Sequence, residues 1–315
     1  MQRYIAQRLI GIAINLFLVT LVIFFALRLV PSNVAAEVLG QNATPQQYQA
    51  FNAKYGLDDP AIVQFSRWIG GIIRGDFGQS FRSNISVSDE FRKRLPITLE
   101  VVIISFVFTS IMGVTFGAVS ALKQNSLIDY GVRLFSIFGL SIPNFLLLTC
   151  LLIFPARWWG YAPRFGATSF LDDPTGNLRL FVPATFMLAI GASAGLMRLT
   201  RSAFLEVVRQ DYVRTARAKG LRERAVILRH ELRNALLPVL TLLGIQLGGL
   251  LGGSIILEQV MGLPGLGTWA LAAISINDFP VVMIVALYTA VVVMAINLLV
   301  DVSYALLDPR VRLAL

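Results

Sequence analysis

Hydrophobic residues gather in six long runs along the chain, and charged and polar residues collect between the runs. A helix of about 20 mostly apolar residues spans the hydrocarbon core of a bilayer, so each run is long enough to cross a membrane. The pattern predicts an all-α integral membrane protein with six transmembrane helices. Their expected positions are residues 9–30, 98–122, 131–155, 181–200, 239–260 and 280–307.

These runs divide the chain into four parts. Residues 1–30 hold an N-terminal tail and the first helix, which is too long for the apolar core of a typical signal peptide and is expected to remain as an anchor. Residues 31–97 form an external segment that is rich in aromatic side chains and nearly balanced in charge, so we expect it to fold. Residues 98–307 form a five-helix core with a cytoplasmic loop at 198–237, and residues 308–315 form a cytoplasmic tail.

Composition agrees with a membrane protein and limits the chemistry. Of 315 residues, 56% are hydrophobic and 14% are charged, and the mean hydropathy is +0.70, which excludes an ordinary water-soluble domain. The single cysteine, Cys150, cannot form an internal disulfide. The single histidine, His230, gives little support to a transition-metal site.

The basic residues predict the orientation. The formal net charge is +9, with sixteen Lys and Arg residues on the side that holds both termini and ten on the opposite side. Because cytoplasmic loops carry the excess of basic residues, both termini are predicted to be cytoplasmic. The loop at 198–237 alone holds ten basic and four acidic residues.

The pattern of this loop is helical. Leu221, Ala225, Leu228 and Leu232 recur at spacings of three or four, which predicts an apolar stripe on a charged helix. The small residues at 216, 218 and 220 offer a surface that another backbone can approach closely. From the pattern alone, a docking surface for a partner protein is favoured over a helix on anionic lipid, and nucleic-acid binding is least favoured because the loop is tethered between two spans.

The residues of the loop carry a resemblance to a known family. The stretches 211–221 (DYVRTARAKGL) and 230–238 (HELRNALLP) resemble the cytoplasmic "EAA" loop of binding-protein-dependent ABC transporter permeases. Within that family the chain resembles the dipeptide, oligopeptide and nickel branch and looks like a dipeptide permease B-type subunit. Further matches lie along the chain at 55–58 (YGLD), 75–78 (GDFG), 141–145 (SIPNF), 263–267 (LPGLG) and 304–310 (YALLDPR). The chain departs from the general pattern at 214–216, where Arg-Thr-Ala stands in place of Glu-Ala-Ala.

The resemblance implies an ABC importer permease of the type I architecture in a prokaryotic plasma (inner) membrane. It implies a homologous second permease subunit, two cytoplasmic ATPase subunits that bind ATP and Mg²⁺, an external solute-binding protein and contact with membrane lipid, but no nucleic acid. The residues expected to couple the chain to the ATPases are Thr215, Ala216, Arg217, Ala218, Lys219, Gly220, Leu221, Glu223 and Arg224. The cargo is expected to be a dipeptide or oligopeptide, with glutathione, a nickel complex or an oligosaccharide as alternatives.

The sequence lacks the motifs for ATP hydrolysis and for a zinc site. No G-x-x-x-x-G-K-[ST] phosphate-binding loop surrounds any lysine, and no H-E-x-x-H zinc motif occurs. We therefore expect a non-catalytic subunit that binds no cofactor and takes energy from ATP hydrolysed on a partner. The alternative is a self-sufficient secondary transporter or channel, although the sequence lacks a convincing internal repeat.

A few residues inside the spans are candidates for the pathway or for helix packing. Polar groups at bilayer depth suggest function but also hold helices together, and packing is favoured here. Glycines in the fifth span form a small-residue face that is expected to pack closely, including against a second permease. A proline inside the third span is expected to kink it. The candidates are Pro143, Asn144, Gln246, Gly249, Gly253 and Glu258.

Overall fold

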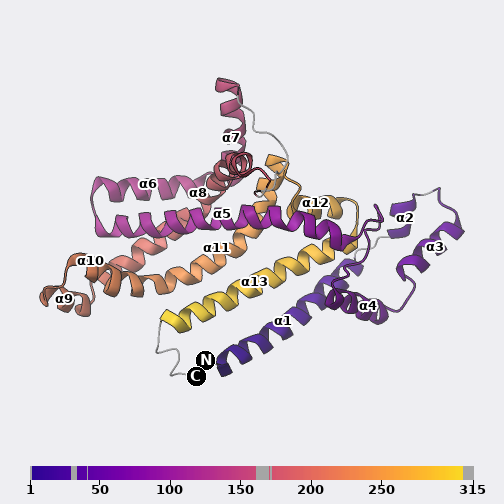
Figure 1. The fold of residues 1–315 in the computed structure, drawn as a ribbon, viewed down its shortest axis with the longest axis horizontal. Coiled ribbons are helices and arrows are strands. Elements are labelled where there is room, and N and C mark those ends of the chain that lie inside the picture. Colours follow the sequence, from indigo (N-terminus) through magenta and orange to yellow (C-terminus); the bar gives the residue numbers. More distant parts are fainter. Residues whose placement is uncertain (1, 30–33, 41, 161–169, 171, 308–315) are drawn as a thin grey trace. The chain divides into compact units, whose positions relative to one another are not determined.

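The computed structural model describes residues 2–29, 34–40, 42–160, 170 and 172–307, with side chains between residues 6 and 304. Within these residues every regular element is a helix, and Gln79 and Ser86 form one isolated antiparallel bridge. The helices (Figure 1) are α1 (Gln2–Arg28), α2 (Val34–Leu39), α3 (Pro45–Tyr55), α4 (Ala61–Arg74), α5 (Val87–Leu122), α6 (Leu127–Ser141), α7 (Asn144–Trp159), α8 (Pro174–Val208), α9 (Asp211–Ala218), α10 (Glu223–Val226), the π-helical turn η1 (Ile227–Glu231), α11 (Leu232–Met261), α12 (Leu266–Ser275) and α13 (Phe279–Leu307).

Five stretches in the described part of the chain are long and apolar enough to cross a membrane, and the bent pair α6 and α7 makes a sixth if it counts as one span. The five are Ala6–Arg28, Val87–Leu122, Pro174–Val208, Glu223–Met261 and Phe279–Tyr304. The predicted all-α membrane architecture is confirmed.

The third predicted span is broken rather than continuous. The sequence predicted one kinked helix over residues 131–155, whereas α6 ends at Ser141 and α7 begins at Asn144, with a 95° bend between them. Pro143 precedes α7, and Ile142 before it is extended, with φ −96° and ψ 123°. A proline has no amide hydrogen and disfavours helical geometry in the preceding residue, so both effects end α6 here. The predicted kink is confirmed, but it divides the expected single helix into two.

The chain divides into two compact units, which we describe separately. The first comprises residues 1–8, 98–263 and 293–315, within the described ranges. Its most buried helix is α8, which contacts α6, α7 and α11. One cluster of this unit joins Met112, Ile190 and Met197, and another joins Ala121, Phe204 and Ala235.

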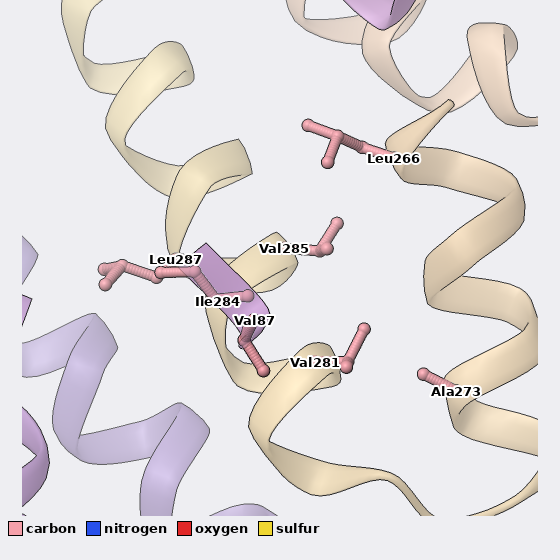
Figure 2. Packing of buried hydrophobic residues seen from close by; sticks show 7 residues of the cluster. All are labelled: Val87, Leu266, Ala273, Val281, Ile284, Val285 and Leu287. Carbon is pink, nitrogen blue, oxygen red and sulfur yellow. The ribbon is translucent and has the colours of Figure 1, made fainter. Parts of the chain in front are cut away.

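The second unit comprises residues 9–97 and 264–292. Its main core joins the start of α5 to α12 and α13, and Figure 2 shows Val281 and Val285 of α13 directed toward α12. The cluster consists of Val87, Leu266, Ala273, Val281, Ile284, Val285 and Leu287. A smaller cluster of Ala35, Phe51 and Phe81 packs the expected external segment, which is folded as the aromatic content predicted.

Local signals explain several helix ends. Thr44 and Gln47 form a capping box before α3, where Pro45 takes the first helical position, and Gly56 closes the helix in the left-handed conformation. Asp173 caps α8 by accepting from the amide of Gly176, and this hydrogen bond lowers the pKa of the Asp173 carboxyl.

Candidate functional site

The predicted coupling segment folds as two short helices joined at Gly220. After α8 ends at Val208, α9 runs to Ala218, and the chain turns at Gly220 in the left-handed conformation, with φ +74°. Glycine adopts this conformation without steric cost. The chain then enters α10, which continues through η1 into α11. The segment is therefore built directly onto the ends of two long apolar helices.

A small apolar core holds the two short helices together. Val213 and Ala216 of α9 pack with Val226 of α10, and Val207 at the end of α8 packs against them. Ala216 is buried, so it does not belong to the exposed small-residue surface that the sequence predicted. Ala218 and Gly220 remain exposed, as expected.

Arg217 forms the polar contact between the two halves of the segment. Its guanidinium donates to the exposed Glu223 carboxylate, with a shortest distance of 2.7 Å, and to Oε1 of the fully buried Glu231, also at 2.7 Å. The hydrogen bond to Glu223 is the main cause that raises the pKa of Arg217, so this side chain stays charged. Arg217 thus ties α9 to both α10 and the π-helical turn.

Glu231 is a residue that sequence reasoning missed. Its second oxygen, Oε2, is buried and has no hydrogen-bond partner within the described residues. A carboxylate is costly to bury and is retained here beside an arginine. The sequence carries no local signal for the pair, because Arg217 and Glu231 lie 14 positions apart on different helices.

The predicted apolar stripe is partly wrong. Leu221 precedes the helix and is 44% exposed, and Leu228 is 50% exposed. The buried positions are instead Val226, Glu231 and Ala235. Val226 and Glu231 are five residues apart because the chain forms a π-helical turn here, in which the Leu232 amide donates to the Ile227 carbonyl. The prediction assumed a regular α-helix, in which buried residues recur every three or four positions.

The remaining docking candidates lie on the surface around the turn. The Thr215 hydroxyl donates a hydrogen bond to the Asp211 carbonyl at 2.9 Å, and the residue is exposed. A pocket of about 310 Å³ lies beside α9, where the Asn234 amide donates to the Tyr212 hydroxyl at 3.0 Å. The exposed candidates are Thr215, Ala218, Lys219, Gly220, Leu221, Glu223 and Arg224.

Most pathway candidates contact other helices of this chain. The Gln246 amide donates to the Ala192 carbonyl on α8 at 3.0 Å. Glu258 is fully buried and accepts from the Thr98 hydroxyl at 2.7 Å. These two contacts agree with the favoured packing interpretation.

The glycine and asparagine candidates divide into two groups. A Cβ at Gly253 would lie 3.1 Å from Leu188, so this glycine admits α8 closely, whereas a Cβ at Gly249 would meet nothing within 4 Å. Asn144 packs directly against Gly191 of α8, since a Cβ added to Gly191 would lie 2.1 Å from the Asn144 amide oxygen. Gly249 therefore faces open space in this chain, and Gly253 and Asn144 take part in packing.

A buried ion pair links α6 to α8. Asp129 is fully buried and accepts two hydrogen bonds from Arg201, at 2.8 and 2.9 Å. It also accepts from the Ser120 hydroxyl at 2.6 Å and from the Asn125 amide at 3.0 Å. Sequence reasoning missed this site too, since no pattern pairs an acid and a base that lie 72 positions apart.

Comparisons with known proteins identify the family. Residues 113–313 match the family described as "Binding-protein-dependent transport system inner membrane component", and residues 1–102 match the N-terminal family of the same transport systems. The chain belongs to this family. It is therefore a multi-pass permease subunit of a binding-protein-dependent transporter. Membership of this family favours the permease function over a self-sufficient secondary transporter or channel.

Several relatives match over nearly the full length. The chain is 37% identical to the oligopeptide transport system permease AppB of Bacillus subtilis, over 99% of this chain and 100% of that protein. It is 35% identical to the dipeptide transport system permease DppB of the same organism and 36% identical to the di/tripeptide permease DppB of Pseudomonas aeruginosa. In both comparisons 99% of each chain is covered. The predicted resemblance to the dipeptide and oligopeptide branch is confirmed.

Solved structures share the fold. The MetNI methionine ABC transporter in an inward-facing conformation aligns with a TM-score of 0.54 and 20% identity, over 70% of this chain and 96% of that chain. An amino acid ABC transporter with histidines aligns with a TM-score of 0.52 and 19% identity, over 68% of this chain and 92% of that chain. The permease architecture predicted from the sequence is confirmed by these similarities.

Proposed function

We propose that this chain is the permease subunit of an ATP-driven importer for dipeptides or oligopeptides and forms half of the translocation pathway. Full-length relatives with 35–37% identity are named as dipeptide and oligopeptide permeases, which supports a peptide cargo. The structural observation that carries the proposal is the α9–α10 turn at Gly220. It is exposed and continues directly into two long apolar helices.

Energy enters through this turn. The Arg217 contacts and the apolar core beneath α9 make the segment a stiff unit, so a force on its surface moves the ends of α8 and α11. Two ATPase subunits dock on the exposed residues among 215–224 and hydrolyse ATP with Mg²⁺ bound to themselves. This chain binds no cofactor and catalyses no reaction. Both termini and the α9–α10 turn lie in the cytoplasm, and the solute-binding protein docks on the opposite side.

A homologous second permease completes the pathway. One face of α11 is exposed at spacings of three and four residues, and its centre carries two glycines where an added Cβ would meet nothing within 4 Å. Such a small-residue face lets a second helix approach closely in a membrane. The exposed residues are Thr241, Ile245, Gly249, Gly252, Ile256 and Gln259.

The docking proposal is tested by substitution at Gly220. An added Cβ meets nothing in this chain, so a Gly220→Tyr side chain would project into the space assigned to the ATPase. Gly220→Asn is the matched control, because asparagine tolerates the left-handed conformation and is smaller. We expect Gly220→Tyr to assemble in the membrane but to lose substrate-stimulated ATPase activity, and Gly220→Asn to keep most of it. Coupled transport by Gly220→Tyr at the normal rate would contradict the proposal.

The cargo is tested by reconstitution. The complex that co-purifies with this chain is placed in vesicles with its solute-binding protein and ATP, and uptake of a labelled dipeptide, a longer peptide and a sugar is compared. ATP-dependent uptake of peptides but not of the sugar is the expected result. Uptake by this chain alone, driven by an ion gradient, would instead favour a secondary transporter.

A further inference from the structure

Helix α4 has three distinct faces. An α-helix turns by about 100° per residue, so residues spaced by three or four share a face. Phe65, Trp68 and Ile72 form one face, and Arg67 and Arg74 form another. Between them lies a third face, with Ile62, Ser66, Ile69 and Ile73 at spacings of four, three and four.

The first face packs on the membrane-spanning helix α1. Figure 1 shows the two helices close together. The Phe65 ring centre lies 6.2 Å from that of Phe17 and 5.2 Å from that of Phe24. The Trp68 ring stacks on Phe24 at 5.7 Å. All of these residues belong to one compact unit.

These contacts set the depth of α4. Phe24 and Phe17 lie about 6 and 16 Å from Arg28, the last residue of α1, at 1.5 Å per residue. Half of the hydrocarbon core is about 15 Å thick. Phe65 therefore packs at the level of the acyl chains of one leaflet, on the side of the membrane opposite the N-terminus.

The isoleucine face is open at this depth. Ile62 is 77% exposed and Ile73 is 80% exposed, comparable with 67% for Val22 on the neighbouring span. Isoleucines directed into water would be unfavourable, whereas acyl chains at this level would cover them. The two arginines lie about 120° around the helix from this face. Both are exposed, and the Arg67 guanidinium pairs with the Asp59 carboxylate at 2.7 Å, so this side of the helix is polar and suits the headgroup region.

We propose that α4 is an interfacial helix whose Ile62–Ile69–Ile73 face is embedded in the acyl chains of the leaflet opposite the N-terminus, with Arg67 and Arg74 toward the lipid headgroups. The partner is the lipid bilayer rather than a protein. The absence of acidic residues on α4 agrees with an anionic membrane surface. The helix would thereby hold the segment after α1 at a fixed depth.

The test uses single spin labels in the assembled transporter. Cys150→Ser removes the native cysteine, and Ile62→Cys, Ile73→Cys and Arg67→Cys are each labelled with a nitroxide, with Val22→Cys as the lipid-facing reference. The complexes are reconstituted in vesicles of phosphatidylcholine and phosphatidylglycerol. Collision rates with oxygen, which concentrates in the acyl chains, and with a water-soluble nickel chelate are measured for each label.

We expect the oxygen-to-nickel ratio at positions 62 and 73 to match the Val22→Cys reference and to exceed the ratio at position 67 several-fold. A ratio at 62 and 73 as low as that at 67 would place the face in water and overturn the proposal. Protection of both positions from both reagents would also overturn it, because a protein surface would then cover the face. Retained transport by the unlabelled cysteine variants shows that each complex is folded.

Discussion

Arg217 on α9 donates a 2.7 Å hydrogen bond to Glu231 in the π-helical turn, and this contact fastens the exposed coupling helix to the start of α11. The same guanidinium also contacts Glu223, but that carboxylate is exposed and Glu231 is fully buried. Burial makes the two contacts unequal, because water screens an exposed ion pair and cannot replace a buried one. The contact with Glu231 should therefore contribute more than the contact with Glu223 to holding α9 in place.

Replacement of Glu231 by alanine should loosen α9. We expect about 1 to 3 kcal/mol of local destabilisation, since the buried partner of a charged side chain is removed. Hydrogen exchange of the amides in α9, measured in the reconstituted complex, should rise, and ATPase coupling should weaken. Glu223→Ala is the matched control and should change local stability by less than about 1 kcal/mol, as for surface ion pairs. Faster exchange in Glu223→Ala than in Glu231→Ala would refute this ranking.

Asp129 should be essential to the stability of the α6–α8 contact. Asp129→Ala leaves Arg201, which is only about one-fifth exposed, without its carboxylate, and breaking a buried pair in this way costs about 3 to 5 kcal/mol. We expect a clear drop in the melting temperature of the detergent-solubilised protein. Asp211→Ala, which removes an almost fully exposed carboxylate, should leave the melting temperature unchanged. Equal melting temperatures for the two variants would contradict the prediction.

The bend between α6 and α7 should be sensitive to Gly191. A Cβ at this position would lie 2.1 Å from the Asn144 amide oxygen, so Gly191→Ala should displace Asn144 and cost about 1 to 3 kcal/mol through overpacking. The double variant Gly191→Ala with Asn144→Ala should recover part of this loss. Gly131→Ala on α6 is the control, since its Cβ would meet nothing within 4 Å. Thermal unfolding of the wild-type protein, Gly191→Ala, Asn144→Ala and the double variant gives the coupling, and strict additivity would disprove the contact.

Asp278 should hold the loop before α5 in place. Its carboxylate is buried and accepts from the Ser80 hydroxyl at 2.5 Å and from the Phe81 amide at 3.0 Å. Asp278→Ala leaves both donors without this acceptor, so the loop should loosen and let trypsin bind the backbone around Arg82, whose side chain is already exposed. We expect faster cleavage after Arg82 than in a Ser275→Ala control, in which only an exposed hydroxyl is removed. An unchanged cleavage rate would argue against this role.

The sequence by itself determined the membrane class, the approximate spans, a kink at Pro143 and the family. These features depend on local properties: the length of an apolar run, the missing amide hydrogen of proline, and short motifs that stay contiguous along the chain. The exposure of Gly220 and its neighbours also followed from sequence, because a polar, glycine-containing stretch between two spans must lie outside the bilayer.

The tertiary structure decided which residues lie beside one another. It paired Arg217 with Glu231 and Asp129 with Arg201, and it buried Ala216, because such contacts depend on how helices distant in sequence are packed. The π-helical turn replaced the predicted apolar stripe, since one five-residue step shifts every later side chain around the helix axis. The depth of α4 likewise came only from its aromatic contacts with α1, since hydropathy predicts that a segment is apolar but not which neighbour it packs against.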